Sequence, residues 1–143
     1  MVSVCLVDQK QHDEVISFYR RVRYRGTLNS GDLVVGARVS GRLVGAVRLA
    51  TEYDLLVLRG MYVQNEFQRQ GIGFGMLVEL LRHLGERECW CIPYTHLHGF
   101  YSHAGFVKST LDSAPGFLVE RLNTYIKSGR QVILMRRGAG GSV

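Results

Sequence analysis

The sequence contains no apolar run long enough to span a membrane, and its first residues carry neither the charged lead nor the cleavage site of a secretory signal. Cysteines are few and odd in number, with only Cys5, Cys89 and Cys91. That count argues against the disulfide framework of a small secreted protein. We therefore expect a cytoplasmic protein with reduced thiols and no membrane partner.

A recognisable set of metal ligands is also lacking. Cys89 and Cys91 share one face of a predicted strand, but a metal site would need further ligands at suitable spacing. His96 and His103 could share a helical face, yet two imidazoles without a carboxylate are poor evidence for a metal. We expect no metal and interpret the two cysteines as buried small hydrophobic side chains.

The composition is that of an ordinary globular protein. The chain has 143 residues, of which 46% are hydrophobic and 21% are charged. This length suits one compact domain with a real core, and nothing in the pattern suggests a second. We expect a single domain over residues 1–137, followed by a flexible tail over residues 138–143.

Acidic residues are outnumbered, which leaves a net charge of +6 and suits an anionic partner. The densest basic run, Arg20, Arg21, Arg23 and Arg25, falls at the end of a predicted helix, where cations also gain from the helix dipole. A solvated helix end explains that run, so we do not expect a nucleic-acid partner.

Hydrophobic periodicity predicts an alternation of strands and helices. Strands are expected at residues 2–7, 33–39, 43–49, 55–63, 88–92, 107–110 and 131–135, and helices from Asp8 to near Gly26, over 72–84 and over about 115–127. Ser40 and Gly41 predict a tight hairpin turn. Gly60 is a candidate β-bulge, which would free backbone groups to face a ligand.

The most informative stretch runs from Leu55 to Gly85. An apolar strand meets a polar, glycine-bearing turn that opens onto a helix with one apolar stripe. A helix start offers unpartnered N–H groups and the positive end of the helix dipole, so this junction suits a phosphate. Two other glycine motifs fail here, because a dinucleotide fingerprint would need glycine at Met76 and no Gly-Lys-Ser/Thr of a Walker loop is present.

The turn Gln68-Arg69-Gln70-Gly71-Ile72-Gly73 resembles the Gln/Arg-x-x-Gly-x-Gly/Ala signature of the GNAT superfamily of N-acetyltransferases, which bind the pyrophosphate of acetyl-CoA. Downstream, Tyr101 followed by Gly105-Phe106 resembles that family's Tyr-x-x-x-Gly-Phe element. The resemblance covers roughly residues 33–108, with the motifs in the right order. One departure is Tyr94, which stands where the family often has an asparagine that contributes to coenzyme A binding.

The resemblance implies an α/β (α+β) fold with a mixed, mostly antiparallel central sheet of about six to seven strands flanked by about four helices. It also implies an acyltransferase that uses acetyl-CoA as co-substrate, with Tyr101 as general acid towards the departing thiolate. The backbone of the central strand would bind the pantetheine and polarise the thioester, and the loop would bind the pyrophosphate. The implied cofactor-binding residues are Met61, Tyr62, Val63, Gln68, Arg69, Gln70, Gly71, Ile72, Gly73 and Phe74.

The acceptor stays open. We prefer the primary amine of a small molecule over a protein or aminoacyl-tRNA amine, and the rival from another class is a non-catalytic module that binds acyl-CoA. Arg48 and Arg59 could pair with an acceptor carboxylate, although pairing with Glu52 or Asp54, or facing solvent, is equally compatible. The general base is unresolved among Glu52, Asp54, His96, His98 and His103, and a water chain to bulk solvent could serve instead. A homodimer is left open.

Overall fold

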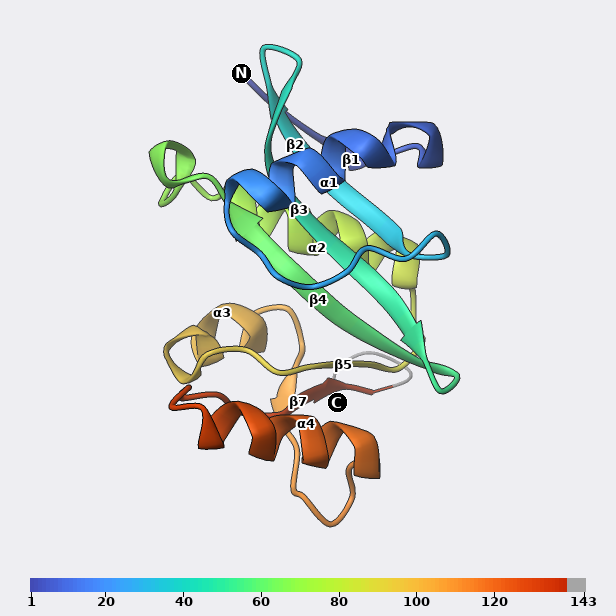
Figure 1. Cartoon of the computed structure of the whole chain (residues 1–143). Coiled ribbons are helices and arrows are strands. Elements are labelled where there is room, and N and C mark those ends of the chain that lie inside the picture. The colour runs from blue at the N-terminus through green and yellow to red at the C-terminus, as the bar shows by residue number, and fades with distance from the viewer. Residues whose placement is uncertain (139–143) are drawn as a thin grey trace. The chain divides into compact units, whose positions relative to one another are not determined.

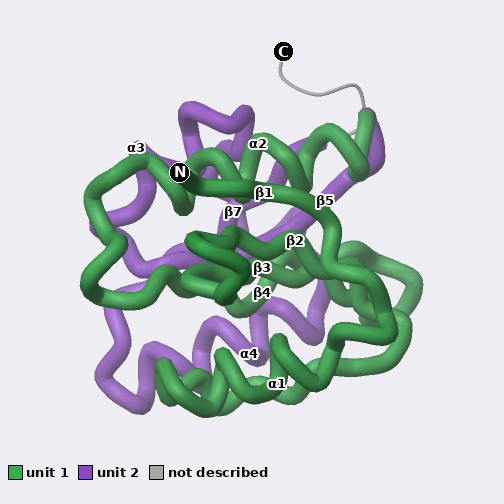
Figure 2. The backbone as a smooth tube through the Cα atoms, turned by 90° about the horizontal axis from the view of Figure 1, so that it is seen from above, with its two compact units in different colours: residues 1–85 green, residues 86–143 purple. Residues whose placement is uncertain are grey.

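The computed structural model describes residues 1–138 (Figure 1). The expected tail, residues 138–143, lies outside the described residues apart from its first position. The chain forms two compact units, Met1–Gly85 and Glu86–Val143, which Figure 2 colours separately. The expectation of a single domain over 1–137 stays a prediction.

The first unit is a four-stranded antiparallel sheet with a helix on each face. Its strands are β1 (Val2–Leu6), β2 (Leu33–Val39), β3 (Arg42–Glu52) and β4 (Leu55–Val63), which pair in sequence order. The helices α1 (His12–Arg21) and α2 (Ile72–Leu84) cover opposite faces of this sheet (Figure 2). Sequential strands joined by short turns explain the simple order.

The predicted hairpin between β2 and β3 is confirmed. Ser40 and Gly41 both have positive φ, 51° and 80°, as a two-residue type I′ turn requires. On the α1 face of this hairpin, Val15, Phe18 and Tyr19 pack with Val34, Leu43 and Ala46. The three α1 residues are at most 3% exposed and are spaced three and four positions apart, as residues on one buried face of a helix are.

The predicted bulge in β4 is also confirmed. Ala46 of β3 opposes Tyr62, whereas Arg48 opposes Arg59, so β4 holds one extra residue at Gly60 and Met61. Gly60 has φ of +67°, a conformation that a side chain disfavours. A bulge of this kind leaves a residue outside the ladder and twists the strand locally.

The second unit contains three short strands and two helices. β7 (Met135–Arg137) pairs antiparallel with both β5 (Cys89–Cys91) and β6 (Val107–Lys108). The helices are α3 (His98–Ser102) and α4 (Gly116–Lys127). Cys89 and Cys91 are at most 2% exposed, as the hydrophobic interpretation predicted, and burial raises the pKa of the Cys91 thiol.

Two predicted boundaries are wrong. The last strand was expected at residues 131–135 but lies at Met135–Arg137, because Pro93 on the facing segment has no N–H to continue the ladder. In its place Ile133 N–H donates to the Pro93 carbonyl at 3.0 Å. The first helix was expected to reach Gly26 but ends at Arg21, since Arg23 adopts a left-handed φ of 65°.

The predicted fold class is confirmed. Residues 1–138 contain seven strands and four α-helices, and every strand pairing within each unit is antiparallel. Three single-turn 3₁₀ helices lie between these elements, at Gln9–Gln11, Asn65–Phe67 and Thr95–Leu97. No helix within the described part of the chain is long and apolar enough to cross a membrane.

Candidate active site

The loop between β4 and α2 has the backbone shape of an anion site. Arg69 and Gly71 both adopt left-handed conformations, with φ of 64° and 80°. Gly71 is the N-cap of α2, and no side chain caps the helix start by a hydrogen bond. Alternation of left-handed and ordinary residues turns successive N–H groups towards one side, which forms a concave anion-binding nest.

The space beside this loop is open. Residues 68–71 are exposed, and a Cβ built on Gly71 would meet no atom within 4 Å. Gly71 is therefore required for its φ rather than for close packing within the chain. The first intrahelical hydrogen bond runs from Gly75 N–H to the Gly71 carbonyl at 3.0 Å, so the preceding amides belong to the helix start, where an anion is favoured.

Two of the predicted cofactor-binding side chains brace the loop from within. Gln68 Nε2 donates to the Val63 carbonyl at 2.8 Å and to Asn65 Oδ1 at 3.2 Å, and Gln70 Nε2 donates to the Glu66 carbonyl at 3.4 Å. The bond to Val63 ties the loop to the end of β4, and the other two bonds hold the loop to its own 3₁₀ turn. Sequence reasoning placed both glutamines at the cofactor without distinguishing this bracing role.

The remaining predicted residues contribute in different ways. Ile72 is 5% exposed, so its side chain anchors α2 and only its backbone is available to a ligand. Met61 lies in the bulge on β4, and Tyr62 and Val63 follow it. Tyr62 is 37% exposed, and its ring centroid lies 5.2 Å from that of Tyr24. The strand therefore presents an aromatic side chain directly after its irregular backbone.

Tyr101 lies in the second unit, on the short helix α3. It is 4% exposed and therefore buried. Its ring makes edge contacts with Phe100 and Phe106 at centroid distances of 5.0 and 5.8 Å. Burial, with Cys91 and Cys89 nearby, raises the pKa of Tyr101 above its ordinary value. The phenol is therefore protonated at neutral pH, as a proton donor must be.

Two further side chains of this region were uncertain from the sequence. Tyr94 is 47% exposed and stacks on His96 with a centroid distance of 5.8 Å, while its backbone bridges to Val132.

Among residues 1–138, no group of three or more His, Cys, Asp and Glu side chains is arranged to hold a metal ion.

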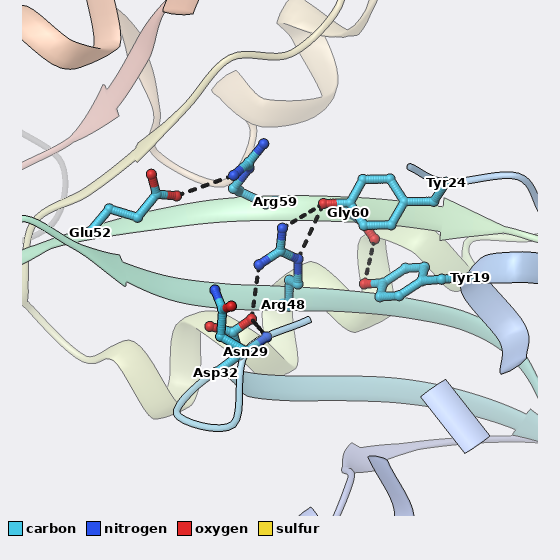
Figure 3. Close-up of polar contacts among 8 residues, drawn as sticks. All are labelled: Tyr19, Tyr24, Asn29, Asp32, Arg48, Glu52, Arg59 and Gly60. Atoms are coloured by element: carbon cyan, nitrogen blue, oxygen red, sulfur yellow. Dashed lines mark hydrogen bonds and ion pairs between the residues drawn. The ribbon is translucent and has the colours of Figure 1, made fainter. Parts of the chain in front are cut away.

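A buried polar cluster in the first unit was not predicted (Figure 3). Arg48 on β3 is 1% exposed and its Nη1 donates to Asp32 Oδ2 at 2.8 Å. Its Nη2 and Nε donate to the Tyr24 hydroxyl at 2.7 and 3.2 Å. Tyr19 completes the cluster, because its hydroxyl donates to the Gly60 carbonyl at 2.8 Å.

This cluster decides the roles of the two arginines. The guanidinium of Arg48 is hydrogen-bonded to Asp32 and Tyr24. It therefore neither faces solvent nor pairs with Glu52, and its donors are used inside the protein. Arg59 Nη1 lies 3.4 Å from Glu52 Oε2, one of the pairings considered from the sequence. The sequence does not indicate this cluster, because Asp32 and Arg48 are separated by 16 residues.

A bulged strand, followed by a loop with left-handed residues and a helix start at Gly71, is the arrangement that the resemblance predicts for an acyltransferase that uses acetyl-CoA. Comparison with known families agrees: the model of the acetyltransferase (GNAT) family matches residues 3–106. The chain belongs to this family, and it is accordingly an acyltransferase of the N-acetyltransferase type. Among curated proteins, no relative matches the sequence.

Solved structures of the family share the fold. Escherichia coli ElaA matches with a TM-score of 0.70 and 14% identity, over 96% of this chain and 99% of that chain. The ribosomal-protein-S18-alanine N-acetyltransferase of E. coli matches with a TM-score of 0.65 and 17% identity, over 95% of this chain and 92% of that chain.

A third similar structure is N-acetylglutamate synthase from Neisseria gonorrhoeae, complexed with coenzyme A and N-acetyl-glutamate. The TM-score is 0.67 at 17% identity, and the match covers 96% of this chain but 35% of that one. This chain therefore corresponds to about a third of the synthase. At such identities the three likenesses establish the fold.

Proposed function

We propose that this protein transfers an acetyl group from acetyl-CoA to the primary amine of a small molecule by direct attack. The observation that carries the proposal is the pair of left-handed residues, Arg69 and Gly71, at the start of α2, in the loop that follows a bulged strand. Those features supply backbone donors for a pyrophosphate and for a polarised carbonyl on adjoining segments of one unit.

The cofactor residues divide into two groups in this proposal. The amides of Met61, Tyr62 and Val63 bind the pantetheine and the thioester, as the family resemblance implies. The pyrophosphate lies against the loop and the first turn of α2, formed by Gln68, Arg69, Gln70, Gly71, Ile72, Gly73 and Phe74. Arg69 adds a positive charge at the exposed rim of this loop.

The reaction proceeds by attack of the neutral amine nitrogen on the thioester carbonyl carbon, which forms the C–N bond and an oxyanion. The oxyanion is stabilised by backbone N–H groups of the bulged strand. When it collapses, the C–S bond breaks and the thiolate takes the phenolic proton of Tyr101. The proton lost by the amine passes to solvent and restores the phenol, so the products are the N-acetyl amine and free coenzyme A.

The assignment of Tyr101 rests on its place in the Tyr-x-x-x-Gly-Phe element and on its burial as a protonated phenol. The acceptor class is supported by one similar structure that holds N-acetyl-glutamate, whereas another similar protein acts on an alanine of a ribosomal protein. The test panel must therefore contain both classes of amine.

The test is release of free thiol from acetyl-CoA with amino acids, polyamines, aminoglycosides and peptides that have free N-termini. We expect turnover with one class of small amine and confirmation of the acetylated product by mass spectrometry. Turnover with peptides alone would show that the acceptor is a protein amine rather than the amine of a small molecule. Coenzyme A binding without turnover on any amine would favour a non-catalytic module, and failure to bind coenzyme A would overturn the proposal.

A further inference from the structure

The bulge on β4 is held from the side by a tyrosine of another element. Gly60 has a left-handed φ of +67°, and its carbonyl accepts the hydroxyl hydrogen of Tyr19, on α1, at 2.8 Å. Tyr19 is 3% exposed, so solvent does not compete for this bond. The two residues are 41 positions apart in the chain, and the bond therefore fixes the bulge relative to the helix rather than within its own strand.

The contact leaves no room for a side chain at position 60. A Cβ built on Gly60 would lie 2.7 Å from Tyr19 Oη and 3.1 Å from a ring carbon of Tyr24. Both distances are tighter than ordinary van der Waals contact, so the two rings pack directly on the glycine backbone. The two tyrosine rings therefore lie against Gly60, and Tyr19 also donates a hydrogen bond to its carbonyl.

Tyr24 is in turn held by the buried ion pair. Its hydroxyl accepts two hydrogen bonds from Arg48, whose third contact is Asp32 Oδ2 at 2.8 Å. The rings of Tyr24 and Tyr19 lie 4.5 Å apart between centroids, at an angle of 57°. Asp32 Oδ2 also accepts the backbone N–H of Asn29 at 2.9 Å, so the whole cluster is anchored to the loop after α1 (Figure 3).

We propose that Tyr19 is a positioning residue for acetyl transfer, which orients the Gly60–Met61 backbone through its hydrogen bond to the Gly60 carbonyl. This inference rests on the proposed function, because the amides after the bulge are the groups assigned to the thioester. Tyr24, Arg48 and Asp32 support Tyr19 by fixing the ring against which it packs. A shift in these donors lowers the rate, since an oxyanion requires its donors at defined positions.

The chemistry of Tyr19 suits a permanent donor. Burial, together with the nearby Tyr24, raises the pKa of the Tyr19 phenol above its ordinary value. The hydroxyl hydrogen is therefore retained at neutral pH, where it is donated to the Gly60 carbonyl. The carbonyl of Gly60 would otherwise be left without this donor in a part-buried site, which is unfavourable.

The experiment compares Tyr19→Phe with two controls. Val15→Ala removes packing from the same core of α1 but keeps the hydroxyl, and Tyr53→Phe removes a hydroxyl from a side chain that is 81% exposed at the β3–β4 turn. Each variant is measured for kcat with the accepted amine, for coenzyme A affinity, for thermal midpoint and for amide hydrogen exchange of residues 59–63.

We expect Tyr19→Phe to lower kcat by roughly 10- to 100-fold, while coenzyme A affinity changes by less than about threefold. Its amides at residues 59–63 should exchange faster than those of the wild type. Val15→Ala should lose thermal stability but keep kcat per folded molecule, and Tyr53→Phe should keep the wild-type kcat and the wild-type exchange at residues 59–63. Wild-type kcat in Tyr19→Phe, or a loss that tracks stability equally in Val15→Ala, would overturn the inference.

Failure of the proposed function gives a different result. If the wild type binds coenzyme A but acetylates no amine, the proposed function falls and hydrogen exchange alone decides the role of Tyr19. Faster exchange at residues 59–63 in Tyr19→Phe, but not in Val15→Ala, would then support control of the bulge. Identical exchange in Tyr19→Phe and the wild type would refute it.

Discussion

Arg48 and Asp32 form an ion pair of 2.8 Å whose side chains are 1% and 3% exposed. Removing one partner of such a pair leaves an uncompensated charge in the interior. We predict that Arg48→Met lowers the free energy of unfolding by about 3–5 kcal/mol, measured by urea denaturation. The loss includes the Tyr24 hydroxyl, which no longer has its two donors.

A double variant separates this effect from simple loss of packing. Arg48→Met combined with Asp32→Leu removes both charges, so its loss of stability should be smaller than the sum of the two single losses. Additive losses would show that the charges do not interact in the folded protein. The prediction also fails if Arg48→Met alone costs less than about 1 kcal/mol.

Glu14 and Arg38 form an exposed counterpart of this pair, with a contact of 2.8 Å. The hydrogen bond from Arg38 lowers the pKa of the Glu14 carboxyl. The stabilisation that the Glu14–Arg38 pair contributes is therefore present above the unfolded pKa of Glu14, about 4.3. It is lost as the pH falls through the lower folded pKa. Because the Glu14 side chain is 44% exposed, solvent screening limits the pair to about 1 kcal/mol or less.

Glu14→Gln measures this contribution. Its unfolding free energy should be slightly below that of the wild type at neutral pH, and the difference should shrink below pH ~4 and in high salt. A difference that grows on acidification would contradict the sign of the pKa shift.

Gly71 allows the charge at the anion loop to be changed without a large change in shape. Asparagine and aspartate both tolerate the left-handed region better than alanine does. We predict that Gly71→Asp binds coenzyme A at least about tenfold more weakly than Gly71→Asn at low salt, because the added carboxylate repels the pyrophosphate. Isothermal titration with coenzyme A measures the two affinities.

The same two variants supply their own stability control. A negative charge at a helix N-terminus is favourable for the helix, so Gly71→Asp should be at least as stable as Gly71→Asn. Gly71→Ala should be less stable than the wild type by about 1 kcal/mol, because φ is +80° and no neighbouring atom obstructs a methyl group. Equal affinities of the Asp and Asn variants would place the pyrophosphate elsewhere.

The pH dependence of activity follows from the protonation of Tyr101. Burial raises its pKa above the ordinary value near 10, so the folded phenol keeps its proton where an unfolded one ionises. The stability that the protonated Tyr101 contributes is complete below the unfolded pKa of about 10. It is lost as the pH rises from there through the higher folded pKa. We predict that kcat/KM rises with amine deprotonation and shows no descending limb from Tyr101 below pH ~10.

Much of the first unit could be predicted because its signals are local. Gly60 interrupts an apolar strand, Ser40-Gly41 sits between alternating segments, and the stripe of α2 repeats at helical spacing. Each feature reports on its immediate neighbours in the chain. The bulge, the hairpin and the helix were therefore predicted with nearly correct bounds.

The buried cluster could not be predicted because its partners are distant in sequence. Nothing around Arg48 indicates that Asp32 and Tyr24 will enclose it, and a charged residue on a strand ordinarily faces solvent. The misplaced last strand has a similar cause. Its pairing is decided by Pro93 on another segment rather than by its own apolar pattern.

Tyr101→Phe tests the central claim most directly. The measurement is single-turnover transfer of a deuterated acetyl group from acetyl-CoA to the accepted amine, read by mass spectrometry, with coenzyme A affinity measured in parallel. We predict that the wild type labels the amine, and that the variant does so about 10²- to 10⁴-fold more slowly with coenzyme A affinity unchanged. Equal rates in the two proteins would contradict the role of Tyr101, and an unlabelled amine with the wild type would contradict acetyl transfer itself.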